Sequence, residues 1–185
     1  MTKIKLLILD VDGVLTSGEL PYLDAGGEVK PFHVQDGAAI KLWKKWGGVV
    51  AIISGRNTPA VEKRAKDLGV QTVIQGVADK QGAYEQILAD LGFNDMETAA
   101  VGDEWLDIPL IQRCGYGIAV ANALPVVKRM ARYVTRRRGG EGVAAEVVER
   151  LLRHNGVWND VVASQCVPKL ADREGARRSA NGTGL

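Results

Sequence analysis

Two carboxylates near the amino terminus are the residues of this sequence best suited to do chemistry. Asp10 and Asp12 directly follow an apolar run at residues 6–9, and Gly13 comes next. The branched side chains of that run predict a strand buried on both faces of a parallel sheet. Side chains alternate along a strand, so the two carboxylates start on the same side and repel each other. A hard cation such as Mg²⁺ between them would relieve this repulsion.

Three further polar residues fall at or near the ends of other predicted strands. Ser54 follows an apolar run and is expected to open a helix, where its hydroxyl and backbone N–H groups can hold a phosphate oxygen. Lys80 offers a cation that can neutralise a phosphoryl group. Asp103 follows Gly102 and adds a carboxylate for the same metal. In open α/β sheets the carboxyl ends of the strands form the ligand-binding crevice, so we expect these residues to meet there.

Strands and helices must alternate along the chain to position these residues. Apolar runs predict the strands, and helical spacing of apolar residues predicts the helices between them. This alternation predicts an α/β fold with a doubly wound, mainly parallel sheet. The predicted strands cover residues 6–9, 49–53, 71–75 and 98–101. Residues 114–120 contain a glycine-rich turn and a fifth short strand, and an extended segment follows at 133–135. The predicted helices begin near residue 35 and cover 59–68, 81–91, 125–131 and, as the last one, 143–153.

Length and composition favour one domain with a substantial core, because the 185 residues are 46% hydrophobic. We place this domain at residues 1–167. Residues 168–185 carry almost nothing apolar and are expected to be disordered. Residues 17–34 predict a projecting hairpin, with two extended segments at 19–23 and 28–34 joined by a glycine-rich turn.

Charge and cysteine content exclude several classes of function. The net charge of +2 does not call for nucleic acid or an anionic membrane as a partner. Cys114 and Cys166 lie far apart, without the spacing of a metal site, and are too few for a secreted disulfide framework. The sequence shows neither a signal peptide nor a membrane-spanning segment, so a cytoplasmic location is expected.

The segment Asp-Val-Asp-Gly-Val-Leu-Thr at residues 10–16 closely resembles the first motif of the haloacid dehalogenase (HAD) superfamily of phosphatases. Ser54, Lys80 and Asp103 resemble its other motifs, in the same order. The resemblance implies that Asp10 is the nucleophile and forms an aspartyl-phosphate. It also implies that Asp12 protonates the leaving sugar oxygen and then activates water.

The same resemblance implies a Mg²⁺ cofactor. Asp10, the backbone carbonyl of Asp12, and Asp103 would hold the metal. Asp107 would lie behind these ligands and orient Lys80 or a metal-bound water. Glu104 stands where the family commonly has Asp. Like Asp107, it is expected to lie behind the metal ligands.

The spacing between the motifs leaves no room for a cap domain. The chain resembles the capless branch that contains the 3-deoxy-D-manno-octulosonate 8-phosphate (KDO 8-phosphate) phosphatases, through residues 32–37, 54–56, 75–80, 133–135 and 139–142. That branch implies a homotetramer assembled through hairpin 17–34, with a neighbour's segment, here within 139–165, closing the site. The predicted hairpin would expose Leu20, Tyr22, Leu23, Val29 and Phe32 to such partners.

The substrate is expected to be a sugar phosphate bound by Gly55, Arg56, Gln35, Asp36 and Gly37. KDO 8-phosphate is the leading candidate, and Arg56 favours it. Gln35 and Ala145 stand where the family commonly has arginines, which removes two cations that could meet a sugar-acid carboxylate. A phosphatase of a nonulosonate 9-phosphate or of another small sugar phosphate is the alternative. A non-catalytic HAD-like binding module is an alternative of another class.

Overall fold

A six-stranded parallel sheet forms the centre of the chain in a computed structural model that describes residues 2–166. The strand order is β3-β2-β1-β4-β5-β6, and β1 pairs with both β2 and β4. This order places the switch point of the doubly wound fold beside the carboxyl end of β1. The strands are β1 (Leu6–Leu9), β2 (Val49–Ser54), β3 (Thr72–Gln75), β4 (Thr98–Gly102), β5 (Tyr116–Ala119) and β6 (Tyr133–Val134).

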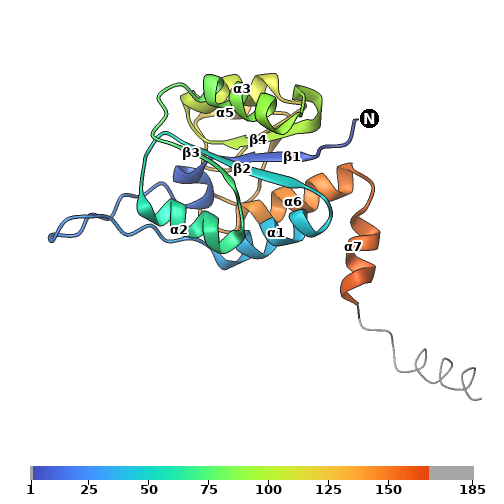
Figure 1. The fold of residues 1–185 in the computed structure, drawn as a ribbon, viewed down its shortest axis with the longest axis horizontal. Helices are drawn as coiled ribbons and strands as arrows, with labels where there is room; N and C mark the ends of the chain where they lie inside the picture. The colour runs from blue at the N-terminus through green and yellow to red at the C-terminus, as the bar shows by residue number, and fades with distance from the viewer. Residues whose placement is uncertain (1, 167–185) are drawn as a thin grey trace, which may run out of the picture.

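Helices cover both faces of the sheet, as Figure 1 shows. α1, α2 and α6 pack on one face, and α3 and α4 pack on the other. The helices are α1 (Val34–Lys45), α2 (Pro59–Leu68), α3 (Lys80–Leu91), α4 (Ile108–Arg113), α5 (Pro125–Met130), α6 (Val143–His154) and α7 (Trp158–Gln165). No helix within residues 2–166 is long and apolar enough to cross a membrane.

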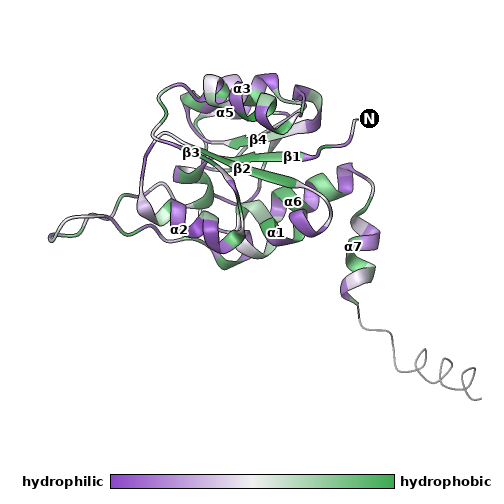
Figure 2. Cartoon of the chain, viewed as in Figure 1, coloured by the Kyte–Doolittle hydropathy of each residue, from purple (hydrophilic) through white to green (hydrophobic). Residues whose placement is uncertain are grey.

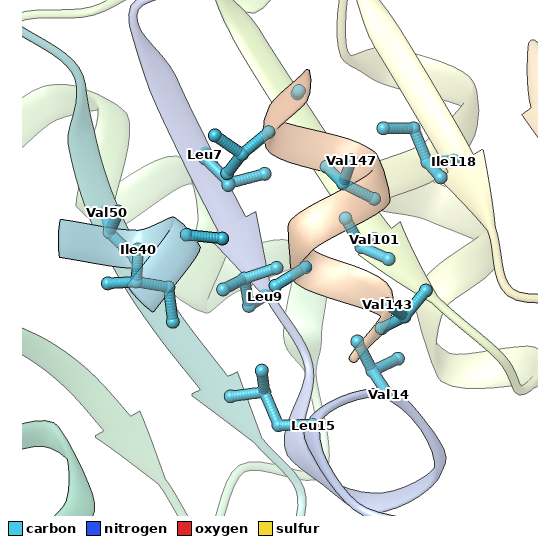
Figure 3. Close-up of a cluster of buried hydrophobic side chains, with 14 of the residues drawn as sticks. Leu7, Leu9, Val14, Leu15, Ile40, Val50, Val101, Ile118, Val143 and Val147 are labelled. Atoms are coloured by element: carbon cyan, nitrogen blue, oxygen red, sulfur yellow. The ribbon is translucent and has the colours of Figure 1, made fainter. Parts of the chain in front are cut away.

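The alternation of side chains along β1 divides the core into two parts. Leu7 and Leu9 point toward α1 and α6, where they meet Ile40 and Val147 (Figure 3). Leu6 and the residues that share its side of the sheet pack under α3 and α4. The central strands are accordingly largely green in Figure 2, whereas the helices show green and purple in alternation. Burial of β1 on both faces confirms the interpretation of its uninterrupted apolar run.

The predicted α/β fold is confirmed, and the ends of two helices lie where glycines predicted them. α2 covers the predicted residues 59–68, and α3 begins one residue before its predicted start. Gly69 and Gly92 end these helices in the left-handed conformation, with φ of 64° and 70°. Glycine adopts this conformation without the penalty that a Cβ atom would bring, so both positions are strong local stop signals.

Three predictions about the periphery need correction. Helix 143–153 is not the last one, because α7 follows it and buries only Val161 completely. The hairpin at residues 17–34 projects from the body as an arm (Figure 1), but it forms a single antiparallel bridge, between Tyr22 and Glu28, in place of two paired strands. Phe32 is not exposed on this arm, since it packs against the core of its own chain. The tail at 168–185 lies outside the described residues.

Asp36 connects α1 to α6 through a buried hydrogen bond. Its Oδ1 atom accepts from the backbone N–H of Ala144 at 2.7 Å, at the start of α6. Its Oδ2 atom has no hydrogen-bond partner among residues 2–166. Burial raises the pKa of Asp36 to about 6, although the N–H of Ala144 and the charge of His33 oppose the rise. The ionised carboxylate therefore destabilises the native state.

We expect Asp36→Asn to stabilise the chain increasingly as the pH rises. Because the folded pKa is raised, the stability contributed by the protonated acid is full below pH 4 and is lost as the pH rises through 6. The free-energy difference between variant and intact chain should grow by about 1 kcal/mol between pH 5 and pH 7.5. Urea denaturation at both pH values measures it, with the exposed Asp67→Asn as control. A difference that stays constant would contradict the raised pKa.

Candidate active site

The carboxyl ends of β1, β2 and β4 surround a pocket of about 250 Å³. A wide turn at Val11–Leu15 follows β1 and carries the chain out of the sheet at this edge. The pocket is lined by Asp10, Asp12, Gly18, Leu20, Gly55, Arg56, Asp103 and Glu104. Residues from three separate parts of the sequence, all predicted to belong to the site, therefore line one cavity.

Lys80 lies behind this pocket and joins two carboxylates. Its Nζ atom donates to Asp10 Oδ1 at 2.6 Å and to Asp107 Oδ1 at 2.7 Å. All three residues are buried. Lys80 is the first residue of α3, and Asp79 caps this helix by accepting from the N–H groups of Gln81 and Gly82. The cap fixes the helix start, and thereby the position from which the ammonium reaches the strand ends.

The pKa values of Lys80 and Asp10 are shifted by burial and by neighbouring charges. Burial by itself would lower the pKa of Lys80, but the charges of Asp10 and Asp107 raise it above its usual value. Burial and the charge of Asp107 raise the pKa of Asp10, against the effect of Lys80. One ammonium thus does not offset the cost of burying two carboxylates, and a further cation would favour the ionised form of Asp10.

Asp103 supplies a third carboxylate to this cluster. Asp10, Asp103 and Asp107 each offer an oxygen atom within 4.8 Å of the others. Asp103 Oδ1 is buried and has no hydrogen-bond partner in the described part of the chain. Burial, together with the charges of Asp107 and Glu104, raises the pKa of Asp103 to about 7. A buried acceptor without a donor, in a set of hard oxygen atoms, fits a Mg²⁺ ion.

Two glycines let the carboxylates approach the backbone. A Cβ atom on Gly13, whose φ is +87°, would lie 2.2 Å from Asp103 Oδ2. A Cβ atom on Gly102 would lie 2.3 Å from Asp107 Cγ. Any side chain at either position would displace a carboxylate of the cluster. Gly13, within the motif at residues 10–16, and Gly102, the last residue of β4, are therefore part of the site.

Asp107 uses both of its oxygen atoms. Oδ1 accepts from Lys80, while Oδ2 accepts from the backbone N–H groups of Asp103 and Glu104 at 2.9 and 3.2 Å. One carboxylate thus holds the lysine and also the turn that carries Asp103. Glu104 lies at the rim of the pocket and begins the short 3₁₀ helix Trp105–Asp107.

Sequence reasoning missed two residues at the pocket, both on the arm. Lys30 forms an ion pair with Asp12, and its Nζ atom lies 3.5 Å from Glu28 Oε1. Glu28 forms a second ion pair, with Arg56. Asp12 is not a member of the three-carboxylate cluster, and its pairing with a lysine was not predicted by the strand alternation. The sequence signal was weak, because Glu28 and Lys30 are two of four charged residues on the arm, with Glu19 and Asp24.

The prediction that Ser54 opens a helix is wrong. Ser54 is the last residue of β2, and α2 begins at Pro59. The buried Ser54 Oγ atom accepts instead from the N–H of Arg56 at 3.3 Å, inside the connecting turn. Its hydroxyl therefore belongs to a tight turn and not to the positive end of a helix.

The structure does not bring Gln35, Asp36 and Gly37 into the pocket. Gln35 lines a separate groove of about 480 Å³ along α1 and α6, and its Oε1 atom accepts from Arg137 at 2.5 Å. Asp36 is buried under α6, and Gly37 faces Arg64.

The glycine-rich loop at residues 139–142 forms hydrogen bonds within its own chain. The backbone N–H of Gly140 donates to the carbonyl of Val14 at 3.0 Å, and that of Gly139 donates to Asn122 Oδ1 at 2.7 Å. This part of the predicted segment 139–165 therefore supports the turn after β1 and is not free to reach a neighbour.

Comparisons with known proteins agree with this geometry. A family model of haloacid dehalogenase-like hydrolases matches residues 72–147. The KDO 8-phosphate phosphatase KdsC of Haemophilus influenzae is 38% identical over 157 residues, which cover 84% of this chain and 87% of the relative.

Solved structures extend the likeness. A probable YrbI family phosphatase of Pseudomonas syringae pv. phaseolica superposes with a TM-score of 0.86 at 42% identity, covering 88% of this chain and 93% of the other. The KDO 8-phosphate phosphatase of Moraxella catarrhalis, in complex with magnesium, phosphate and KDO, gives a TM-score of 0.84 at 36% identity, covering 87% and 92%.

Mg²⁺ is expected to raise the melting temperature of the chain, and Asp103→Asn to abolish this rise. An ion at 100 times its dissociation constant would stabilise the native state by about 2.7 kcal/mol. The variant should also melt higher than the intact chain in EDTA, because it removes one of the mutually repelling carboxylates. Scanning calorimetry with Mg²⁺ and with EDTA tests both effects. The exposed Asp90→Asn serves as control, and a full Mg²⁺ response in Asp103→Asn would exclude this residue as a ligand.

Proposed function

Because this chain belongs to the haloacid dehalogenase-like hydrolases, in the family of KDO 8-phosphate phosphatases, we propose that it hydrolyses KDO 8-phosphate to KDO and phosphate with Mg²⁺ as cofactor. The observation that carries this proposal is the buried arrangement of Asp10, Lys80 and Asp103 at the end of β1. It combines a carboxylate nucleophile, a fixed cation and a metal-binding oxygen atom.

Asp10 attacks phosphorus in this proposal. One of its oxygen atoms forms a bond to phosphorus as the bond to the sugar oxygen breaks, which gives an aspartyl-phosphate. Lys80 holds Asp10 through Oδ1, and Asp107 holds Lys80, so the nucleophile is oriented before the substrate arrives. Asp12 gives its proton to the leaving sugar oxygen. It then removes a proton from the water that hydrolyses the aspartyl-phosphate.

Asp10, Asp103 and the backbone carbonyl of Asp12 are the groups proposed to hold Mg²⁺. When bound, the ion shields the phosphate from the carboxylates and stabilises the negative charge of the transferring group. Ser54 and the turn that it stabilises are proposed to hold a phosphate oxygen, while Gly55 and Arg56 line the pocket on the sugar side. The free thiols of Cys114 and Cys166 agree with a reducing compartment, and we include a cytoplasmic location in the proposal.

A related sugar-acid phosphate is the second candidate substrate, because Gln35 and Ala145 stand where two arginines are common in the family. Arg137 donates to Gln35, but both residues line the separate groove along α1 and α6 and not this pocket. The third hypothesis, a non-catalytic binding module, does not explain why Asp10, Lys80 and Asp103 are all in place.

The intact chain is expected to hydrolyse p-nitrophenyl phosphate with Mg²⁺, and KDO 8-phosphate with the highest kcat/KM of a panel of sugar phosphates. Asp10→Asn should remove all turnover without unfolding the chain, because an amide cannot attack phosphorus but has the same shape. Phosphate release and circular dichroism measure the two effects, with Asp90→Asn as control. Activity that survives in Asp10→Asn would refute this nucleophile, and a nonulosonate 9-phosphate as the best substrate would favour the second candidate.

We further propose that the arm assembles the chain into a homotetramer. Its tip exposes Leu20, Tyr22, Leu23 and Val29, while a lone bridge pairs its two halves. An isolated two-stranded hairpin is marginally stable in water, and partner arms could cover its apolar side chains and backbone edges. A closed ring of arms meets this need. α7, which extends from α6 in Figure 1, is the part of segment 139–165 left to approach a neighbour's site.

Light scattering of the intact chain is expected to give the mass of four chains. Replacing Tyr22, Leu23 and Val29 with serine should give monomers, because the apolar contact between arms is lost. Met96→Ser removes an exposed apolar side chain elsewhere and should leave the tetramer intact. A fully active monomer of the intact chain would contradict assembly through the arm.

A further inference from the structure

Every cation that residues 2–166 bring to the pocket is already paired with a carboxylate of the same chain. Lys80 lies between Asp10 and Asp107. Lys30 pairs with Asp12. Arg56 pairs with Glu28. An anionic substrate therefore competes with one of these carboxylates when it binds a cation of the protein.

Glu28 is the one of these carboxylates that the proposed reaction does not use. In that reaction Asp10 attacks phosphorus, Asp12 protonates the leaving oxygen and Asp107 holds Lys80. Glu28 comes from the arm, and only 12% of its side chain is exposed. It reaches Arg56 with Oε2, while Oε1 lies 3.5 Å from Lys30 Nζ and has no hydrogen bond within the described chain.

The surroundings of Glu28 are those of a carboxylate bound between two cations. Lys30 has only 3% of its side chain exposed, although most of the arm around it is open to solvent. Arg56 lines the pocket and keeps its buried Nε atom without a hydrogen-bond partner in residues 2–166. A guanidinium can bind a carboxylate through two N–H groups, and here one of its donors is still free for a better-placed anion.

We propose that Glu28 occupies the place of the substrate's carboxylate, and that a sugar acid exchanges with it on Arg56. This inference rests on the proposed function. Exchange leaves the charge at Arg56 unchanged, whereas a phosphorylated sugar without a carboxylate cannot compete with Glu28 there. Glu28 thus sets the affinity for sugar acids, since it competes with the substrate's carboxylate for Arg56, whereas a substrate without a carboxylate does not bind there.

Glu28→Gln provides the test, because it keeps the length of the side chain and removes its charge. KM for KDO 8-phosphate is expected to fall roughly tenfold, by loss of a charged competitor for Arg56, with kcat unchanged. KM for glucose 6-phosphate and p-nitrophenyl phosphate should stay within about twofold, because neither substrate carries a carboxylate. Arg56→Gln should raise KM for KDO 8-phosphate and thus act in the opposite direction. Asp24→Asn, at the exposed tip of the same arm, is the matched control.

An unchanged or higher KM for KDO 8-phosphate in Glu28→Gln would overturn the inference, as would equal changes on all three substrates. Failure of the proposed function has a different signature, because the intact chain would then hydrolyse none of the three phosphates. In that case, calorimetric titration with KDO itself still decides about Glu28. Its affinity should rise in Glu28→Gln and fall in Arg56→Gln, and equal affinities would reject the exchange.

Discussion

The buried ammonium of Lys80 is the interaction on which the rest of this structure depends. A charge taken out of water is tolerated only when partners of opposite charge lie within hydrogen-bond distance. Asp10 and Asp107 meet this condition from the end of β1 and from the turn after β4. Their meeting requires β1 and β4 to be neighbours and α3 to begin at the same edge of the sheet. The strand order 3-2-1-4-5-6 satisfies both requirements.

The same cluster holds more negative than positive charge. Asp103 joins the two carboxylates that Lys80 pairs, and no second ammonium within residues 2–166 meets this group. In the folded chain the carboxylates of this site therefore repel one another until a cation binds. The glycines at 13 and 102 bring the carboxylates closer still, because they remove the side chains that would hold them apart. Metal affinity and reduced stability of the metal-free chain have one cause here.

The sequence correctly predicted those parts of the fold that depend on local signals. Apolar runs predicted the strands, and Gly69 and Gly92 predicted helix ends, because a left-handed residue is needed where these helices stop. Polar residues directly after strands predicted the pocket, because the carboxyl ends of parallel strands share one edge. α7 escaped prediction since its position depends on packing against α6, with Val161 alone fully buried. The hydrogen bond between Asp36 and Ala144 joins residues 108 positions apart, so no local sequence pattern predicts it.

The arm shows how one residue can belong to two parts of a molecule. Glu28 forms the only backbone bridge of the arm within the described chain, opposite Tyr22, and its side chain is anchored on Arg56 at the pocket. Glu28 therefore connects the backbone of the arm to the guanidinium that lines the pocket, so the arm and the pocket share one residue.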